Sequence, residues 1–120
     1  MGDLVSLAKY LPARADRART DKAPVVFDRR ELELILRVYG RKVVAGEWRD
    51  YSLLFDSNCA TFAVGRSAFE VPEFRIVKSR SGTPRFAVIA RGGRIVRRGD
   101  VLADVLRQFD GKRRPTLLTG

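Results

Sequence analysis

The chemistry most evident in this sequence is that of the arginine guanidinium group. Between Arg75 and Gly99 the chain carries eight basic residues and no acidic one. Arginine side chains form paired, charge-assisted hydrogen bonds with phosphate oxygens, and several together can follow a nucleic-acid backbone. This interval therefore predicts a surface that binds RNA or DNA through its phosphates. The residues expected to carry it are Arg75, Arg85, Arg91, Arg94, Arg97 and Arg98.

Base recognition is not expected on this surface. Sheets that bind single-stranded RNA place exposed aromatic rings between the basic residues, so that bases can stack on them. Here Phe74 and Phe86 alternate with the arginines and fall on the opposite side of their strands. Three interpretations remain: binding of the nucleic-acid backbone, binding of an acidic protein partner, or an arginine-rich surface with no dedicated partner.

A second candidate is the only tryptophan, Trp48, which lies between Glu47 and Arg49 at a predicted helix-to-strand corner. Tryptophan and arginine are enriched at the energetic centres of protein interfaces, so Trp48 and Arg49 are candidates for holding a protein partner. Alternatively, Trp48 fills the end of the core beside Tyr39 and Tyr51. Of the two, the pattern favours the core position.

The sequence is poor in groups that catalyse reactions. It contains no histidine, the commonest general base and metal ligand, and its single cysteine is Cys59. It also lacks a glycine-rich phosphate loop followed by Lys-Ser or Lys-Thr. Glu47 and Asp50 are better explained as an ion-pair partner of Arg49 and a turn residue than as a catalytic pair. We therefore expect a protein that is not an enzyme and needs no metal or cofactor.

Length and composition limit the class of protein further. The 120 residues, 45% of them hydrophobic, are enough for one domain with an ordinary core. The formal net charge of +10 at pH 7 favours acidic partners. A single cysteine suits a reducing compartment, and neither a secretory signal nor a membrane-spanning run is visible. We expect a cytoplasmic protein without a membrane partner, and leave its oligomeric state open.

The segment 28–46 predicts the first helix. Asp28 and Glu31 have the spacing of a capping box, and Gly46 is placed to end the helix in the left-handed conformation. The apolar residues between them recur at helical spacing and predict one buried stripe. That stripe consists of Leu32, Ile35, Leu36, Tyr39 and Val43.

Alternating segments joined by short turns follow this helix. Ser57-Asn58 and Gly92-Gly93 have the composition of tight hairpin turns, Asn58 being expected in the left-handed conformation. Connections this short leave no room for parallel crossovers, so the pattern predicts an antiparallel meander of four or five strands. The predicted strands are 51–56, 59–66, 74–78, 85–91 and 94–98.

Strand alternation divides the sheet into two faces. Phe74, Ile76, Phe86 and Val88 share one face, while Arg75, Arg85 and Arg91 share the other. We expect the helices to cover the apolar face and the arginines to point into solvent. The fold class is therefore α+β, with an N-terminal and a C-terminal helix packed on one face of the sheet.

The second helix is predicted to begin at Asp100, acting as its N-cap, and to end at Gly111. It carries an apolar stripe of Leu102, Val105, Leu106 and Phe109. The chain then divides into a flexible N-terminal arm, 1–23, a single α+β domain, 24–111, and a basic tail, 112–120, which would extend the arginine surface. A short helical turn docked on the domain is the alternative for the N-terminal arm.

The chain also resembles a known family. The resemblance rests on 25–32, Tyr39-Gly40 and above all the string Gly46-Glu47-Trp48-Arg49-Asp50-Tyr51. Later pieces also match: Arg75-Ile76, Gly92-Gly93, Arg97-Arg98-Gly99 and the helix 102–106. It is similar to an uncharacterised, mostly alphaproteobacterial family of domains of unknown function. The resemblance implies a bacterial cytoplasmic protein over roughly residues 24–110, and it brings no catalytic or binding residues with it.

Overall fold

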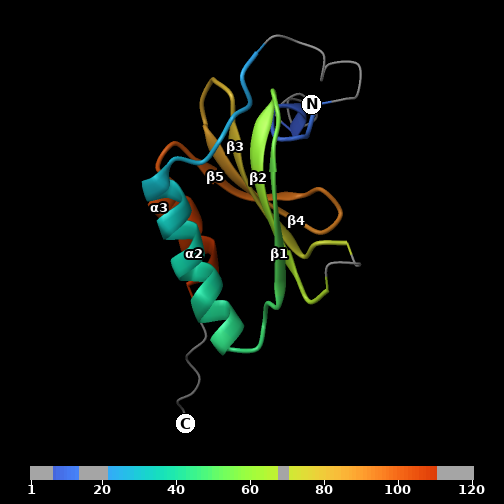
Figure 1. Ribbon diagram of the computed structural model, residues 1–120, viewed down its shortest axis with the longest axis vertical. Helices are drawn as coiled ribbons and strands as arrows, with labels where there is room; N and C mark the ends of the chain where they lie inside the picture. Colours follow the sequence, from blue (N-terminus) through green and yellow to red (C-terminus); the bar gives the residue numbers. More distant parts are fainter. Residues whose placement is uncertain (1–6, 14–21, 68–70, 111–120) are drawn as a thin grey trace.

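The computed structural model describes residues 7–13, 22–67 and 71–110 (Figure 1). Within them the chain forms a helix, five strands and a short second helix, so the predicted α+β class is confirmed. No helix in this described part is both long and apolar enough to cross a membrane. The elements are α2 (Arg29–Val44), β1 (Asp50–Phe55), β2 (Cys59–Gly65), β3 (Phe74–Ser79), β4 (Phe86–Ala90), β5 (Ile95–Gly99), α3 (Leu102–Val105) and the 3-10 helix η2 (Leu106–Phe109).

The five strands form one antiparallel sheet in the order β1-β2-β3-β4-β5, which is the predicted meander. Gly92 and Gly93 both have positive φ, 93° and 90°, as the tight turn between β4 and β5 requires. The prediction for Asn58 was wrong, because no non-glycine residue in the described segments has positive φ. Instead, the Asp56 carboxylate accepts hydrogen bonds from the backbone N–H groups of Asn58 and Cys59, at 2.8 and 3.0 Å.

Helix α2 begins and ends as its sequence predicts. The Asp28 carboxylate accepts from the Glu31 N–H, and the Glu31 carboxylate accepts from the Asp28 N–H, both at 2.8 Å. Gly46 follows the helix at φ 80°. The predicted stripe is only partly buried. Ile35 is buried, but Leu36 and Val43 are exposed, and Val38, which the predicted stripe left out, is buried instead.

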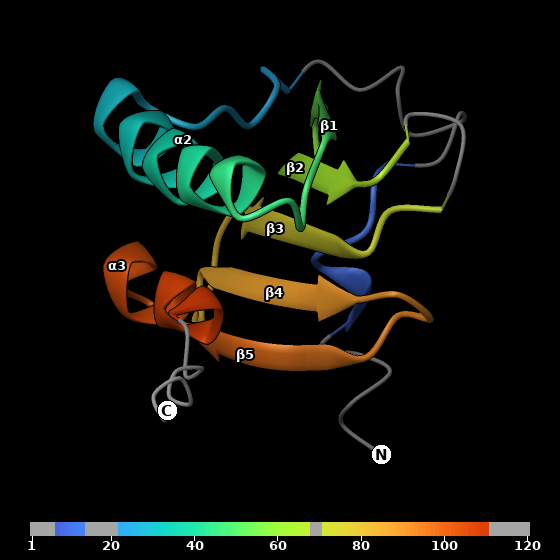
Figure 2. The same ribbon diagram turned by 90° about the horizontal axis from the view of Figure 1, so that it is seen from below.

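The main core lies between the sheet and the helical segments. Figure 2 shows α2 and α3 on the same side of the sheet. Their buried side chains form one cluster with the strand residues that alternate toward them. The helices contribute Ile35, Val38, Leu102, Val105, Leu106 and Phe109, and the strands contribute Ala60, Phe62, Val64, Ile76, Phe86 and Val88.

The opposite face of the sheet is not the solvent-facing surface that alternation predicts. Val77, Ala87 and Ile89 are fully buried there, together with Cys59 and Tyr10. Their cover comes from the N-terminal segment, since apolar side chains at the centre of a sheet are costly to leave in water. The sheet therefore has the predicted apolar face under the helices, but the face predicted to be basic and exposed to solvent is largely buried as well.

Residues 7–13 form the docked turn that was the alternative to a flexible arm. Tyr10 is 1% exposed, and its hydroxyl donates to the Pro84 carbonyl at 2.7 Å. The Asn58 side-chain amide donates to the carbonyls of Ala8 and Leu11, and the Ala13 N–H donates to the Asp56 carboxylate at 3.0 Å. The predicted basic tail, 112–120, and Gly111 lie outside the described residues, as does most of the remaining arm.

The second helix has the predicted buried stripe but a different start. Val101 occupies the N-cap position, and its side chain makes no capping hydrogen bond. Asp100 faces the 81–84 turn instead, where its carboxylate accepts from the Arg85 N–H at 2.9 Å and from the Thr83 hydroxyl. The start of the helix and the 81–84 turn both offer donors for the Asp100 carboxylate, and the donors at the turn hold it.

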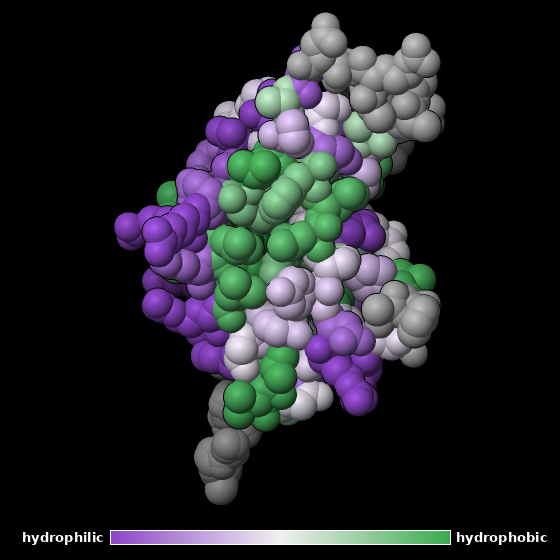
Figure 3. Space-filling view, viewed as in Figure 1, coloured by the Kyte–Doolittle hydropathy of each residue, from purple (hydrophilic) through white to green (hydrophobic). Residues whose placement is uncertain are grey.

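The sheet has two unlike edges, β1 and β5. Four large apolar side chains of β1 are exposed: Tyr51, Leu53, Leu54 and Phe55. Figure 3 shows a continuous apolar area over this strand and the neighbouring rim of α2. At the other edge, β5 ends in Arg97, Arg98 and Gly99 and pairs with β4 through an irregular register.

Candidate functional site

The six candidate arginines lie on three neighbouring strands and their turns. Arg75 is in β3, Arg85 and Arg91 flank β4, Arg94 follows the Gly92-Gly93 turn, and Arg97 and Arg98 are in β5. In the β4–β5 register, Arg97 lies opposite Val88 and Arg98 opposite Ala87. Because adjacent strand positions point to opposite faces, the β5 edge presents a guanidinium group on each side of the sheet.

A hollow of about 460 Å³ lies along this edge of the sheet. Three of the predicted arginines line it, and no acidic residue does. Its remaining lining is apolar or glycine, including Leu7 from the docked turn, which sequence reasoning did not assign to a site. The complete lining is Leu7, Gly93, Arg94, Ile95, Val96, Arg97 and Arg98.

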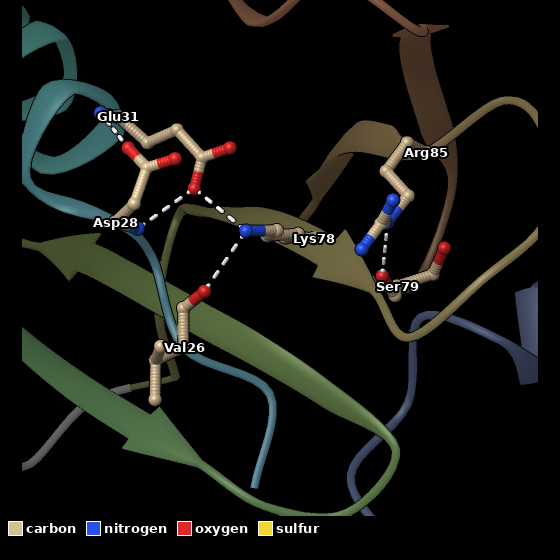
Figure 4. Close-up of polar contacts among 6 residues, drawn as sticks. All are labelled: Val26, Asp28, Glu31, Lys78, Ser79 and Arg85. Atoms are coloured by element: carbon tan, nitrogen blue, oxygen red, sulfur yellow. Dashed lines mark hydrogen bonds and ion pairs between the residues drawn. The ribbon is translucent and has the colours of Figure 1, made fainter.

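The arginines differ in whether the fold already uses them. Across residues 7–13, 22–67 and 71–110, the side chains of Arg75, Arg94, Arg97 and Arg98 make neither hydrogen bonds nor ion pairs. By contrast, Arg85 donates through Nε to the Ser79 carbonyl at 2.8 Å (Figure 4), and Arg91 donates to the Val71 carbonyl at 3.2 Å. Three of the four unpaired arginines, Arg94, Arg97 and Arg98, are those that line the hollow.

Two further basic residues of the interval hold the fold together. Lys78 lies on the helical side of β3, where Nζ contacts the Glu31 carboxylate at 2.8 Å and the Val26 carbonyl at 3.0 Å (Figure 4). Glu31 also belongs to the capping box of α2, so this pair attaches the start of the helix to the centre of the sheet. Arg80 donates from Nε to the Ser57 carbonyl at 2.6 Å and also contacts the Ala23 carbonyl.

Two pKa shifts describe the electrostatics of the face that carries the docked turn. Burial raises the pKa of Tyr10, while the charge of Arg98 lowers it and that of Asp100 raises it. Burial also raises the pKa of Cys59 to about 11; the Thr61 hydroxyl opposes this, Asp56 adds to it, and Arg75 opposes it. The Cys59 thiol is therefore neutral at physiological pH and is a poor nucleophile.

Trp48 lies in the core. It is 4% exposed, and its ring contacts those of Phe109, Tyr39 and Phe74 at centroid distances of 4.9, 6.3 and 6.5 Å. This placement agrees with the core interpretation, whereas the neighbouring Arg49 is exposed. Glu47 does not pair with Arg49, as the sequence suggested, but with Lys42 at 3.0 Å. No group of three possible metal ligands occurs among the described residues.

The model of a family described as "Protein of unknown function (DUF2794)" matches residues 25–106. The chain belongs to this family. This match confirms the resemblance to a family of domains of unknown function. All six candidate arginines fall inside the matched range. The matched range leaves out the docked turn, including Leu7 and Tyr10. No curated protein and no solved structure matches the chain.

The N-terminal contribution to the site had a sequence signal. Leu7, Tyr10 and Leu11 recur at helical spacing ahead of a polar run, which is the pattern of one apolar helical face. The composition of the whole arm is polar and charge-mixed, which is typical of a flexible segment, and it favoured that prediction over the short helical pattern. The hollow at β5 had no such signal, because it forms between segments more than 80 residues apart in the chain.

Proposed function

We propose that this domain binds the sugar-phosphate backbone of nucleic acid along the β5 edge of its sheet. The observation that carries the proposal is the hollow lined by Arg94, Arg97 and Arg98 without a carboxylate. Guanidinium groups held near one another without acidic partners raise the local positive potential and attract polyanions. A phosphate group that enters the hollow would replace water around the guanidinium groups of Arg94, Arg97 and Arg98, which have no ion-pair partner among the described residues.

The apolar part of the hollow suits a backbone ligand. Leu7, Ile95 and Val96 offer contacts for sugar carbons between the phosphate-binding arginines. No aromatic side chain lines the hollow, so bases have no ring to stack on there. We therefore propose binding that depends little on base sequence, with Arg75 as an additional contact on the face that also carries Arg98.

The proposed role is non-enzymatic and cytoplasmic. The chain has no histidine, and its one thiol is buried and neutral at physiological pH. A backbone-binding domain with unpaired arginines acts by positive charge and shape alone. Such a domain needs access to nucleic acid, which the cytoplasm provides.

The experiment that tests the proposal is a salt titration of binding. Fluorescence anisotropy would measure the affinity of the purified chain for labelled duplex DNA and for single-stranded RNA of mixed sequence. If three arginines each neutralise one phosphate, the log–log slope against salt is roughly −2.7 for duplex DNA and roughly −2.1 for a single strand. Binding that hardly changes with salt would contradict a phosphate site.

A matched pair of charge-reversal variants separates this site from net charge. The triple variant Arg94→Glu, Arg97→Glu and Arg98→Glu should remove most of the salt slope. The control variant Arg30→Glu, Arg37→Glu and Arg107→Glu changes the net charge equally at three exposed residues outside the hollow. Equal losses in both variants would show that binding follows total charge and not the β5 edge.

A further inference from the structure

The two edges of the sheet differ in how they are protected against pairing with another strand. Exposed edges of natural sheets are usually blunted by charged residues, proline or bulges. The β5 edge has two such features, the arginines at positions 97 and 98 and the register shift between Val88 and Ile89. β1 has no lysine, arginine or proline and carries a charge only at its first residue, Asp50. It pairs with β2 over six consecutive residues without a shift.

The side chains of β1 are apolar and accessible. Tyr51, Leu53, Leu54 and Phe55 are between 38% and 46% exposed. Leu36 and Val43 of α2 are exposed as well, and they share a helical stripe with Tyr39, whose ring contacts that of Tyr51 at 4.9 Å. From these fractions, and 150–250 Å² for a whole aromatic side chain, the apolar area at this edge is on the order of 400 Å².

The main chain of β1 offers a free row of hydrogen-bonding groups. Among the described residues, β1 pairs with β2 alone. At the hairpin, the Asp56 N–H donates to the Cys59 carbonyl, while the Asp56 carbonyl accepts from the Val25 N–H. Within β1, the even-numbered residues therefore direct their main-chain groups toward β2. By alternation, the N–H and C=O groups of Tyr51, Leu53 and Phe55 point away from the sheet.

We propose that β1 pairs with β1 of a second copy of this chain, antiparallel and across a two-fold axis, so that two sheets join into one of ten strands. An antiparallel strand pair is compatible with a two-fold axis. If residue i of one copy faces residue j of the other, then residue j of the first copy faces residue i of the second. We infer a register centred on Leu53. It places Leu53 opposite Leu53 of the partner subunit and Tyr51 opposite Phe55 of the partner subunit.

Charge supports a second copy as the partner. The chain carries a formal charge of +10, so two copies repel each other over most of their surfaces. They meet with least repulsion where basic residues are missing, and β1 contains none. In the inferred register, the residues from Tyr51 to Phe55 face only one another, and all of these are uncharged. At each end of this stretch Asp50 faces Asp56 of the partner subunit, and this like-charge contact lowers the affinity of the dimer.

The area is consistent with a reversible dimer. Standard interfaces bury about 800 Å² per partner, and weak or transient ones bury less. The apolar edge supplies on the order of half of that area. The strand backbone supplies directional hydrogen bonds in addition, so we expect an equilibrium between monomer and dimer that responds to concentration.

Analytical ultracentrifugation and amide hydrogen exchange of the wild-type chain test the proposal together. Sedimentation should show the mass of two chains at high concentration and of one chain on dilution. In NMR-detected exchange, the amides of Tyr51, Leu53 and Phe55 should become protected as the dimer forms. A single-chain mass at every concentration, with these amides exchanging freely, would overturn the proposal and leave the edge to a strand from another protein.

A pair of lysine variants tests the register. Leu53→Lys puts two like charges opposite each other at the two-fold axis and should shift the dimer to monomer by at least tenfold in dissociation constant. Val101→Lys adds the same charge at an exposed valine, 56% accessible, beside the opposite edge, and should leave the dimer unchanged. A dimer that tolerates Leu53→Lys as well as Val101→Lys refutes this interface. If Leu53→Lys fails to fold, the amide exchange of Tyr51, Leu53 and Phe55 in the wild-type chain still tests whether β1 forms the interface.

Discussion

Replacing Tyr10 tests whether the N-terminal turn is part of the fold. The Tyr10 ring is buried against the centre of the sheet, and its hydroxyl is bonded to the Pro84 carbonyl. Tyr10→Phe keeps the ring but leaves that carbonyl without its donor. Tyr10→Ala removes the ring as well and uncovers Val77, Ala87 and Ile89.

The two substitutions should differ several-fold in their effect on the free energy of unfolding. The lost hydrogen bond in Tyr10→Phe costs about 1 kcal/mol. Truncating a fully buried aromatic side chain costs about 3–5 kcal/mol, so we expect about 4 kcal/mol for Tyr10→Ala. That is a large share of the roughly 5–15 kcal/mol that stabilises a typical domain.

Urea denaturation followed by Trp48 fluorescence measures these values. Trp48 is the only tryptophan, and it lies in the core on the other side of the sheet, so its signal reports unfolding of the whole domain. Leu11→Ala is the matched control. It lies in the same turn but is 37% exposed and should cost less than about 1 kcal/mol. If Tyr10→Ala is no more destabilising than Leu11→Ala, the turn does not stabilise the domain.

Two further predictions concern buried polar groups. The pKa of Cys59 is raised from 9.0 to about 11, so the thiol stabilises the fold below pH 9 and this contribution is lost as pH rises from about 9 to 11. Chemical denaturation at several pH values should show a loss of about 2–3 kcal/mol that is absent in Cys59→Ala; equal pH dependence in both chains would contradict it. Lys78→Met leaves the Glu31 carboxylate, 17% exposed, without its cation, and urea denaturation should show a loss of about 2 kcal/mol. Adding Glu31→Gln should recover part of that loss, and a purely additive double variant would show that the pair is not coupled.

The features that the sequence predicted well depend on neighbours in the chain. The capping box of Asp28 and Glu31 spans three residues, and the positive φ of Gly92 and Gly93 depends on glycine itself. Short turns and strand alternation then determine the meander. The predicted arginines are placed on neighbouring strands for the same reason. Their binding role stays a prediction.

The features that the sequence missed depend on competition between distant groups. Asp100 has the residue type of an N-cap, but the Arg85 N–H and the Thr83 hydroxyl occupy its carboxylate. Alternation placed Val77 and Ile89 on a solvent-facing side, because it cannot show that residues 7–13 return to cover them. The difference between the arginines that bond to carbonyls and those that do not is likewise a property of the assembled sheet.

The docked turn sets an order of events during synthesis. Tyr10 leaves the ribosome early, yet its partner Pro84 lies 74 residues later. At 5–20 residues per second, the turn waits roughly 4–15 s before its docking surface exists. The first described segment of the chain is therefore among the last to reach its place. A fragment that starts at residue 25, where the family match begins, would lack the docked turn. The face of the sheet opposite the helices would then be uncovered, and its Cys59, Val77, Ala87 and Ile89 would be exposed to water.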